Sequence, residues 1–269
     1  MTYVVKIGGS TLSDGVHEGI IRDIRTLSRK KKIVIVHGGG NEVTRIAEKM
    51  GKEQVFVVSP GGIRSRYTDK DTADIFTMVM AGKINKDIVA TLQRNNINAV
   101  GMSGIDGGII RAKRKKKLVI IDERKRRMII DGGYTGKIQK IDPVIIQSLL
   151  DSGCIPVLAP VAAGEDFEFL NVDGDRAAAY VAGSLKATSA IFVTDVEGIK
   201  INEKVIDRLT LNEARTLLPK MGYGMEKKLL AAIEALEMGV GECIISSGLI
   251  EKPLEAALEH STGTVITNE

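Results

Sequence analysis

Short apolar runs alternate with amphipathic stretches along most of the chain. The runs YVVKIGG near the start and KIVIVHGGG at 32–40 are each followed by apolar residues at helical spacing, over 16–29 and 41–51. The same alternation returns at IPVLAPV, AIFVTDVEG and GECIISSG, the last after a helix expected over 226–238. Runs that are apolar on both faces and separated by helices are typical of a parallel sheet covered on both sides. The pattern therefore predicts an α/β fold.

Three further segments complete this prediction. INAVGMSG reads as another strand after a helix near 83–95. In 117–131, KLVIID and RRMIID flank ERKR, which predicts a β-hairpin projecting from the main sheet. A new motif rich in glycine and aspartate starts near residue 170, and we expect a boundary between two lobes there.

Composition narrows the class of protein. The chain has 269 residues, 43% hydrophobic and 27% charged, which is ordinary for a globular protein of one large domain or two lobes. No apolar run reaches the roughly 18 to 20 residues of a membrane span. The two cysteines and three histidines form neither a disulfide framework nor a metal-type cluster. We expect a cytoplasmic protein that binds no membrane.

Positive charge is concentrated in one segment. RAKRKKKLVIIDERKRR, residues 111–127, holds ten of the 38 lysines and arginines. Such a segment can be a solvated hairpin whose charge protects a sheet edge from pairing, or a docking surface for an acidic partner. The hairpin lacks the aromatic residues on which single-stranded nucleic acids stack, so we expect no nucleic-acid partner.

Several predicted strands end in glycine and polar residues: KIGGS, HGGGN, GMSGIDGG and TDVEG. In an open α/β sheet, ligands bind at the carboxyl ends of the strands. Glycines there let backbone N–H groups approach a phosphate, and the following helix adds partial positive charge. The chain has neither a Walker A motif nor G-x-G-x-x-G after a strand. These turns predict a phosphate or nucleotide site of another type.

Two later motifs add charged groups. LNVDGDRAAAYVAGSL, 170–185, places Asn171, Asp173 and Asp175 before an alanine-rich helix. They could cap that helix, but two acids and an amide exceed what a cap needs, and a carboxylate here could hold lysines near phosphate. Lys227 and Lys228 lie in the first turn of the late helix, where they oppose the helix dipole. They are either solvated or directed at an anionic ligand.

Taken together, K-x-G-G-S, H-G-G-G, N-V-D-G-D-x-A-A and G-M-x-x-K resemble the amino acid kinase family. Within it, the chain is similar to N-acetylglutamate kinases over essentially its whole length. The resemblance implies a three-layer αβα sandwich with a mainly parallel central sheet. Residues 1–170 would bind an acidic amino-acid substrate and 171–269 would bind ATP. The reaction would move the γ-phosphoryl group of ATP to a side-chain carboxylate, giving an acyl phosphate.

The resemblance also implies roles for individual residues. Lys6 and Lys228 would neutralise the phosphoryl group in flight, and Asp175 would position both lysines. Gly8 would leave space for the phosphate, and Gly9 would donate its N–H to it. The remaining matches are Thr194 and Asp195 for the nucleotide and Gly39, Gly40, Arg66 and Asn171 for the substrate. Mg²⁺ would be held mainly by the ATP phosphates, so we expect no dedicated protein metal site.

The stretch PGGIRSRYTDKDT, 60–72, departs from the usual N-G-L/F-R-V-T. Arg66 aligns with the arginine that binds the substrate α-carboxylate, because Tyr67-Thr68-Asp69 then takes the place of V-T-D, and Arg64 is an extra arginine. Together with the basic hairpin, this variant resembles the subgroup that phosphorylates α-aminoadipate or glutamate tethered to an acidic amino-group carrier protein, LysW. That subgroup serves lysine or arginine synthesis in archaea and some thermophilic bacteria. The carrier would dock on the basic hairpin, through Lys113, Arg114, Lys115, Lys116, Lys117, Arg124, Lys125, Arg126 and Arg127.

Two alternatives stay open at this point. The chain could be a plain N-acetylglutamate kinase of arginine synthesis, or a non-catalytic sensor that binds ATP or an amino acid. The presence of Lys6, Asp175 and Lys228 argues against the sensor. A homodimer is suggested by the resemblance.

Overall fold

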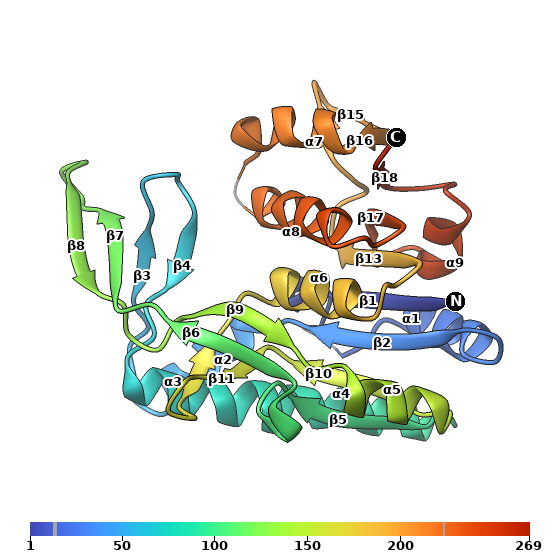
Figure 1. The fold of residues 1–269 in the computed structure, drawn as a ribbon, viewed down its shortest axis with the longest axis horizontal. Coiled ribbons are helices and arrows are strands. Elements are labelled where there is room, and N and C mark those ends of the chain that lie inside the picture. Colours follow the sequence, from blue (N-terminus) through green and yellow to red (C-terminus); the bar gives the residue numbers. More distant parts are fainter. Residues whose placement is uncertain (13–14, 223) are drawn as a thin grey trace.

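The computed structural model describes residues 1–12, 15–222 and 224–269. Its centre is an eight-stranded sheet with the order β16-β18-β17-β13-β1-β2-β10-β5 (Figure 1). In this sheet β17 and β18 pair antiparallel, and the other neighbours pair parallel. The prediction of a mainly parallel sheet is confirmed. Its strands are β1 (Thr2–Ile7), β2 (Lys32–His37), β5 (Ala99–Ser103), β10 (Ile155–Ala159), β13 (Ser189–Thr194), β16 (Arg208–Thr210), β17 (Glu242–Ser247) and β18 (Thr264–Thr267).

Helices cover both faces of this sheet, which confirms the three-layer αβα architecture. Successive residues of a strand point to opposite faces, so Val4 and Val36 contribute to one core and Val5 and Ile35 to the other. The first core includes α5 (Val144–Asp151), α6 (Gly174–Ser184), α7 (Leu211–Leu217) and α8 (Met225–Glu237). The second includes α1 (Glu18–Leu27), α2 (Gly40–Lys49), α3 (Lys70–Thr77), α4 (Asn85–Arg94) and α9 (Pro253–Leu258).

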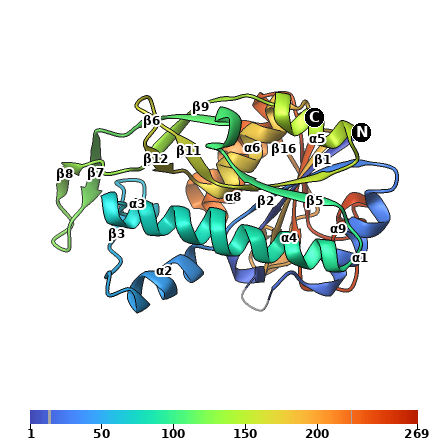
Figure 2. The same cartoon turned by 90° about the horizontal axis from the view of Figure 1, so that it is seen from below.

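The helix predicted over 83–95 is the end of a much longer one. α3, the π-helix η2 (Met78–Ile84) and α4 run end to end across one side of the sheet (Figure 2). Ile75, Phe76 and Met80 are buried against the sheet, and burial of such side chains stabilises the fold by about 1.5–3 kcal/mol each. Tertiary packing therefore extends the helix beyond the part that its own pattern indicated.

The basic hairpin is present, as β7 (Lys117–Ile121) paired with β8 (Arg127–Asp131), and it projects from the body of the molecule (Figure 1). It does not extend from the main sheet as predicted. It continues two strands of a second sheet, β6 (Ile110–Arg114) and β9 (Gly136–Ile141), whose other strands are β11 (Val161–Ala163) and β12 (Phe169–Asn171). A second projecting hairpin, β3 (Phe56–Val58) with β4 (Arg64–Arg66), lies beside it, and β3 contacts β7.

Smaller elements complete the described chain. A short hairpin pairs β14 (Lys200–Ile201) with β15 (Lys204–Val205), and single turns of 3₁₀-helix form η1 (Gly9–Leu12), η3 (Asp106–Gly108) and η4 (Leu218–Lys220). In the described ranges, no helix has the length and apolar character needed to cross a membrane.

Candidate active site

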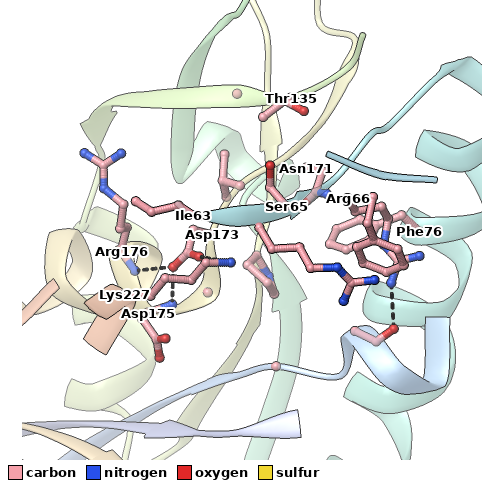
Figure 3. Close-up of a pocket in the computed structure, with 18 of the residues that line it drawn as sticks. Ile63, Ser65, Arg66, Phe76, Thr135, Asn171, Asp173, Asp175, Arg176 and Lys227 are labelled. Atoms are coloured by element: carbon pink, nitrogen blue, oxygen red, sulfur yellow. Dashed lines mark hydrogen bonds and ion pairs between the residues drawn. The ribbon is translucent and has the colours of Figure 1, made fainter. Parts of the chain in front are cut away.

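A cavity of about 570 Å³ opens at the carboxyl ends of β1 and β2, between the sheet edge and the two projecting hairpins (Figure 3). Its inner wall holds Lys6, Asp175 and the glycine turns that follow both strands. Its outer wall is formed by residues of β3, β4 and β7. A cavity of this size can enclose a ligand larger than a single amino acid.

The two glycine turns pack backbone against backbone. A Cβ atom on Gly9 would lie 2.8 Å from the backbone nitrogen of Gly39, which is closer than real Cβ atoms come to other atoms. Gly39 also has φ +146°, a conformation that side chains disfavour. The N–H of Gly8 donates to the carbonyl of Val193 at 3.0 Å and so ties the first turn to β13. Glycine is thus required here for steric reasons, and Gly9, Gly39 and Gly40 all line the cavity.

A buried cluster of three charges forms the inner end of the cavity. Lys6 points to the same face of the sheet as Val4, where α6 begins, and its Nζ lies 2.7 Å from Oδ1 of Asp175. Lys228, in the first turn of α8, lies 3.6 Å from Oδ2 of the same carboxylate. Burial acts to raise the pKa of Asp175, but the positive charges of Lys6 and Lys228 outweigh it, and the net pKa is below its ordinary value. Asp175 is therefore ionised, and the cluster carries an excess of one positive charge.

Asp173 and its neighbours form a second charged group beside this cluster. Asp173 caps α6, because its Oδ1 accepts from the backbone N–H groups of Asp175 and Arg176 at 3.0 and 3.1 Å. Its Oδ2 lies 3.9 Å from Nζ of Lys227. Arg176 Nε donates to Glu234 at 2.8 Å, which ties α6 to α8. Asp173 therefore has the capping role that was considered for the acidic motif, whereas Asp175 forms ion pairs with Lys6 and Lys228.

The wall opposite the lysines holds Arg66 and Asn171. Arg66 Nη2 donates to the carbonyl of Gly40 at 2.8 Å and to Oγ1 of Thr44 at 2.9 Å, and its Nη1 donates to Gln54. Within the described part of the chain, no carboxylate forms a salt bridge with it. Burial, together with the nearby charge of Arg64, lowers the pKa of Arg66 to about 10. Asn171 Nδ2 donates to Oγ1 of Thr68 at 3.0 Å, which ties β12 to the segment after β4. A buried guanidinium without a carboxylate suits an anionic ligand.

The nucleotide candidates lie apart from the cavity. Thr194 ends β13, and its Oγ1 donates to Oδ1 of Asp195 at 3.0 Å. The described residues that line the cavity do not include these two, Gly8 or Lys228. In the first turn of α8, Lys227 lines the cavity, whereas Lys228 lies outside the cavity lining and pairs with Asp175.

The residues of the basic segment separate into three environments. Lys113, Lys116, Lys117 and Arg124 to Arg127 are exposed, and Arg126 pairs with Asp122 at 2.8 Å. Arg114 lies over the ring of Tyr134 and donates to the carbonyl of Gly133 at 2.6 Å. Lys115 lies partly buried in the cavity wall. A count of charges along the sequence cannot separate these environments, because they depend on how the chain passes from β6 to β7.

A buried neutral pair was not predicted. His37, at the end of β2, and Asn85, at the start of α4, are both fully buried. His37 Nδ1 lies 3.0 Å from the carbonyl of Gly38, so Nδ1 carries the proton and donates. Its Nε2 therefore accepts from Asn85 Nδ2 at 3.2 Å, and that amide also lies 2.9 Å from the carbonyl of Val157. Burial, with the charges of Lys6 and Lys86, lowers the pKa of His37 to about 4. The only sequence signal was a polar residue directly before the glycine turn.

Known proteins resemble this chain along most of its length. The family model described as "Amino acid kinase family" matches residues 1–247. A protein of Nitrosopumilus maritimus is 53% identical over 265 residues, covering 98% of this chain and 99% of that protein. A LysW-aminoadipate/LysW-glutamate kinase of Saccharolobus solfataricus is 46% identical over 266 residues, with the same coverage. The structure of N-acetylglutamate synthase from Neisseria gonorrhoeae, 26% identical, superposes on all of this chain and 59% of its own, with a TM-score of 0.81. The chain belongs to the amino acid kinase family.

Proposed function

We propose that the protein transfers the γ-phosphoryl group of ATP to the side-chain carboxylate of α-aminoadipate or glutamate carried on LysW, giving an acyl phosphate. The observation that carries this proposal is the convergence of Lys6, Asp175 and Lys228 beside two glycine turns. The carrier-linked acceptor is supported by the relative from Saccharolobus solfataricus, which covers nearly the whole chain. The presence of Lys6, Asp175 and Lys228 together argues against a non-catalytic sensor.

The cluster suits phosphoryl transfer for an electrostatic reason. The attacking carboxylate and the γ-phosphoryl group are both negative and repel each other at close range. Lys6 from β1 and Lys228 from α8 would approach the transferring group from two sides and lower that repulsion, while Asp175 holds both ammonium groups in place. Backbone N–H groups of the Gly9 turn would add hydrogen bonds to its oxygens. Aligning two anions and screening their charge is most of the catalysis in such reactions.

The acceptor would lie along the cavity between the cluster and Arg66. Arg66 would bind the α-carboxylate, Gly39 and Gly40 would contact the acceptor through their backbone, and Asn171 would bind beside Thr68. Gly8, Thr194 and Asp195 would serve the nucleotide and its phosphates. We accordingly propose that residues 1–170 form the acceptor lobe and residues 171–269 the ATP lobe.

Magnesium is expected to enter with ATP. In the described ranges of the chain, no group of three or more His, Cys, Asp or Glu residues has the arrangement of a metal site. The nearest carboxylates are already engaged, Asp175 by lysines and Asp173 by backbone N–H groups. These residues do not fit a dedicated metal site, and we assign no step of the mechanism to the ion.

The choice of acceptor can be tested directly. Turnover of ATP would be measured with carrier-linked aminoadipate, carrier-linked glutamate and free N-acetylglutamate in parallel. We expect turnover with at least one carrier-linked acceptor and little with the free compound. Turnover of free N-acetylglutamate alone would identify a plain N-acetylglutamate kinase and reject the proposal.

We further propose that the carrier docks on the projecting hairpin, since an acidic protein is attracted to an exposed cationic surface. Reversing the charges of Arg124, Lys125, Arg126 and Arg127 should weaken carrier binding and flatten its dependence on salt. The pair Arg29→Glu and Lys30→Glu is a control for Arg124→Glu and Lys125→Glu, because it changes exposed charges just before β2, at the opposite end of the sheet. Equal effects of the two pairs would show that only net charge matters.

A homodimer is also proposed, on the resemblance to the family alone. Analytical ultracentrifugation of the wild-type chain would measure the mass in solution. A monomer at micromolar concentration would reject this part of the proposal and leave the catalytic part standing.

A further inference from the structure

Lys115 lies where the cavity and the projecting hairpin meet. It follows β6 and precedes β7, and its backbone N–H donates to the carbonyl of Thr135 at 2.9 Å, so the strand pairing fixes its position. Its neighbours Lys116 and Lys117 are exposed, whereas Lys115 is partly buried and lines the cavity. Lys115 therefore has an environment unlike that of the other lysines of the basic segment, although the sequence predicted one docking surface for all of them.

The charges around Lys115 are unbalanced. Among the described residues, six cationic side chains line the cavity, and the acidic ones there are Asp173 and Asp175. Lys6, Arg176 and Lys227 each have a carboxylate partner, in Asp175, Glu234 and Asp173. In the same described ranges, no carboxylate forms a salt bridge with Lys115. Burial and the nearby charges of Arg176 and Lys137 lower its pKa, and the charge of Asp173 only partly opposes them. A ligand with several negative charges would restore the balance.

The course of the cavity indicates which part of a ligand reaches Lys115. From the sheet edge the cavity runs outward between the hairpins, past Phe56, Val57 and Ile63 on one side and Leu118, Val119 and Ile120 on the other. Lys115 directly follows β6, lies two residues before β7 and lines this cavity. Thr194 and Asp195, proposed for the nucleotide, lie outside the cavity wall. A group bound by Lys115 therefore belongs to the acceptor, or to the segment that attaches the acceptor to its carrier, and not to ATP.

We propose that Lys115 is a specificity-determining residue that binds a carboxylate on the segment tethering the acceptor amino acid to its carrier protein. This inference rests on the proposed function, because a tether exists only if the acceptor is protein-linked. Arg66 would bind the carboxylate of the acceptor itself, and Lys115 would bind the next negative charge outward. The apolar channel between the hairpins would enclose the tether beyond that charge.

The test compares Lys115→Gln with the wild type, using steady-state kinetics with the carrier-linked acceptor and with ATP. We expect KM for the carrier-linked acceptor to rise about 10- to 100-fold, as for a lost hydrogen bond to a charged group. KM for ATP and kcat should change little, and Lys115→Arg should recover most of the affinity. Lys140→Gln removes an exposed charge from β9 of the same sheet and should leave both KM values unchanged. Thermal unfolding of each variant shows whether the fold is retained.

The other outcomes overturn the inference. A rise in KM for ATP instead would assign Lys115 to a nucleotide phosphate, and unchanged KM values would leave it as a surface charge. An equal rise in KM for a free acylated acceptor, assayed at high concentration, would show that Lys115 contacts the amino acid and not the tether. Failure of the wild type to use any carrier-linked acceptor would instead reject the proposed function, and with it the tether.

Discussion

Two buried polar groups lie at the same edge of the sheet but on its opposite faces. In the register of β1 and β2, Lys6 lies opposite Val36 and Ile7 lies opposite His37. Lys6 points to the face covered by α6 and meets Asp175. His37 points to the face covered by α4 and meets Asn85. The first group is charged and the second is neutral, although both are buried.

The difference reflects two ways of keeping polar atoms inside a protein. On the charged face, the Asp175 carboxylate lies between the two ammonium groups and compensates part of their charge, and removal of one partner of such a group is costly. His37 avoids the cost of a buried charge by staying neutral, with both ring nitrogens hydrogen-bonded. The charged face can thus supply positive charge to a phosphoryl group. On the neutral face, His37 donates a hydrogen bond to the carbonyl of Gly38 and so positions the glycine turn that lines the cavity.

The largest effect should come from the charged face. Lys228→Ala removes one of the two ammonium groups, and kcat should fall about 10²- to 10³-fold, as when one stabilising donor of a transition state is lost. The variant should still fold, because Lys6 remains paired with Asp175. Steady-state kinetics at saturating ATP and acceptor, with circular dichroism as the control for folding, would measure this. An unchanged kcat would remove the charged cluster from the mechanism.

The neutral face should appear in the pH dependence of stability. The unfolded chain protonates His37 near its ordinary pKa of about 6.5, whereas the folded chain holds it neutral down to about 4. The contribution of neutral His37 to the free energy of unfolding amounts to about 3 kcal/mol. It is complete above pH 6.5 and is lost as the pH falls to 4. Urea unfolding of the wild type and of His37→Asn over this range would measure it, since their difference cancels the other titrating groups. Parallel curves would contradict a buried neutral histidine.

The smallest effect should separate the two hydrogen bonds of His37. Asn at this position can keep a donor near the carbonyl of Gly38, whereas Gln can keep a polar group near Asn85. We expect His37→Gln to lower kcat/KM for the acceptor about tenfold, from one hydrogen bond lost at the turn, and His37→Asn to lower it less. The stability order should be reversed, with Asn the less stable variant. If the same variant were the weaker one in both activity and stability, His37 would only support the fold.

The sequence was sufficient for one face and not for the other. Lys6, Asp175 and Lys228 stand in motifs whose order resembles a known family, and the alternation along β1 gives the face on which Lys6 lies. The neutral pair has no such pattern, because Asn85 becomes buried only through the long helix from Lys70 to Arg94. Lys115 was assigned to the surface because a run of like charges does not show where the strand pairing turns one of them inward. The second sheet, which carries the hairpin, was also missed, because the sequence does not show which strands pair with one another.

The central position of β1 has a consequence for how the protein is made. β1 pairs with β2 on one side and with β13 on the other, and Tyr3 lies opposite Ser189. At a synthesis rate of roughly 5 to 20 residues per second, the first strand is synthesised roughly ten to forty seconds before this partner. Until then one edge of an apolar strand remains open, and contacts between such distant segments slow folding. The pairing of Lys6 with Asp175 and Lys228 therefore becomes possible only once most of the chain has been synthesised.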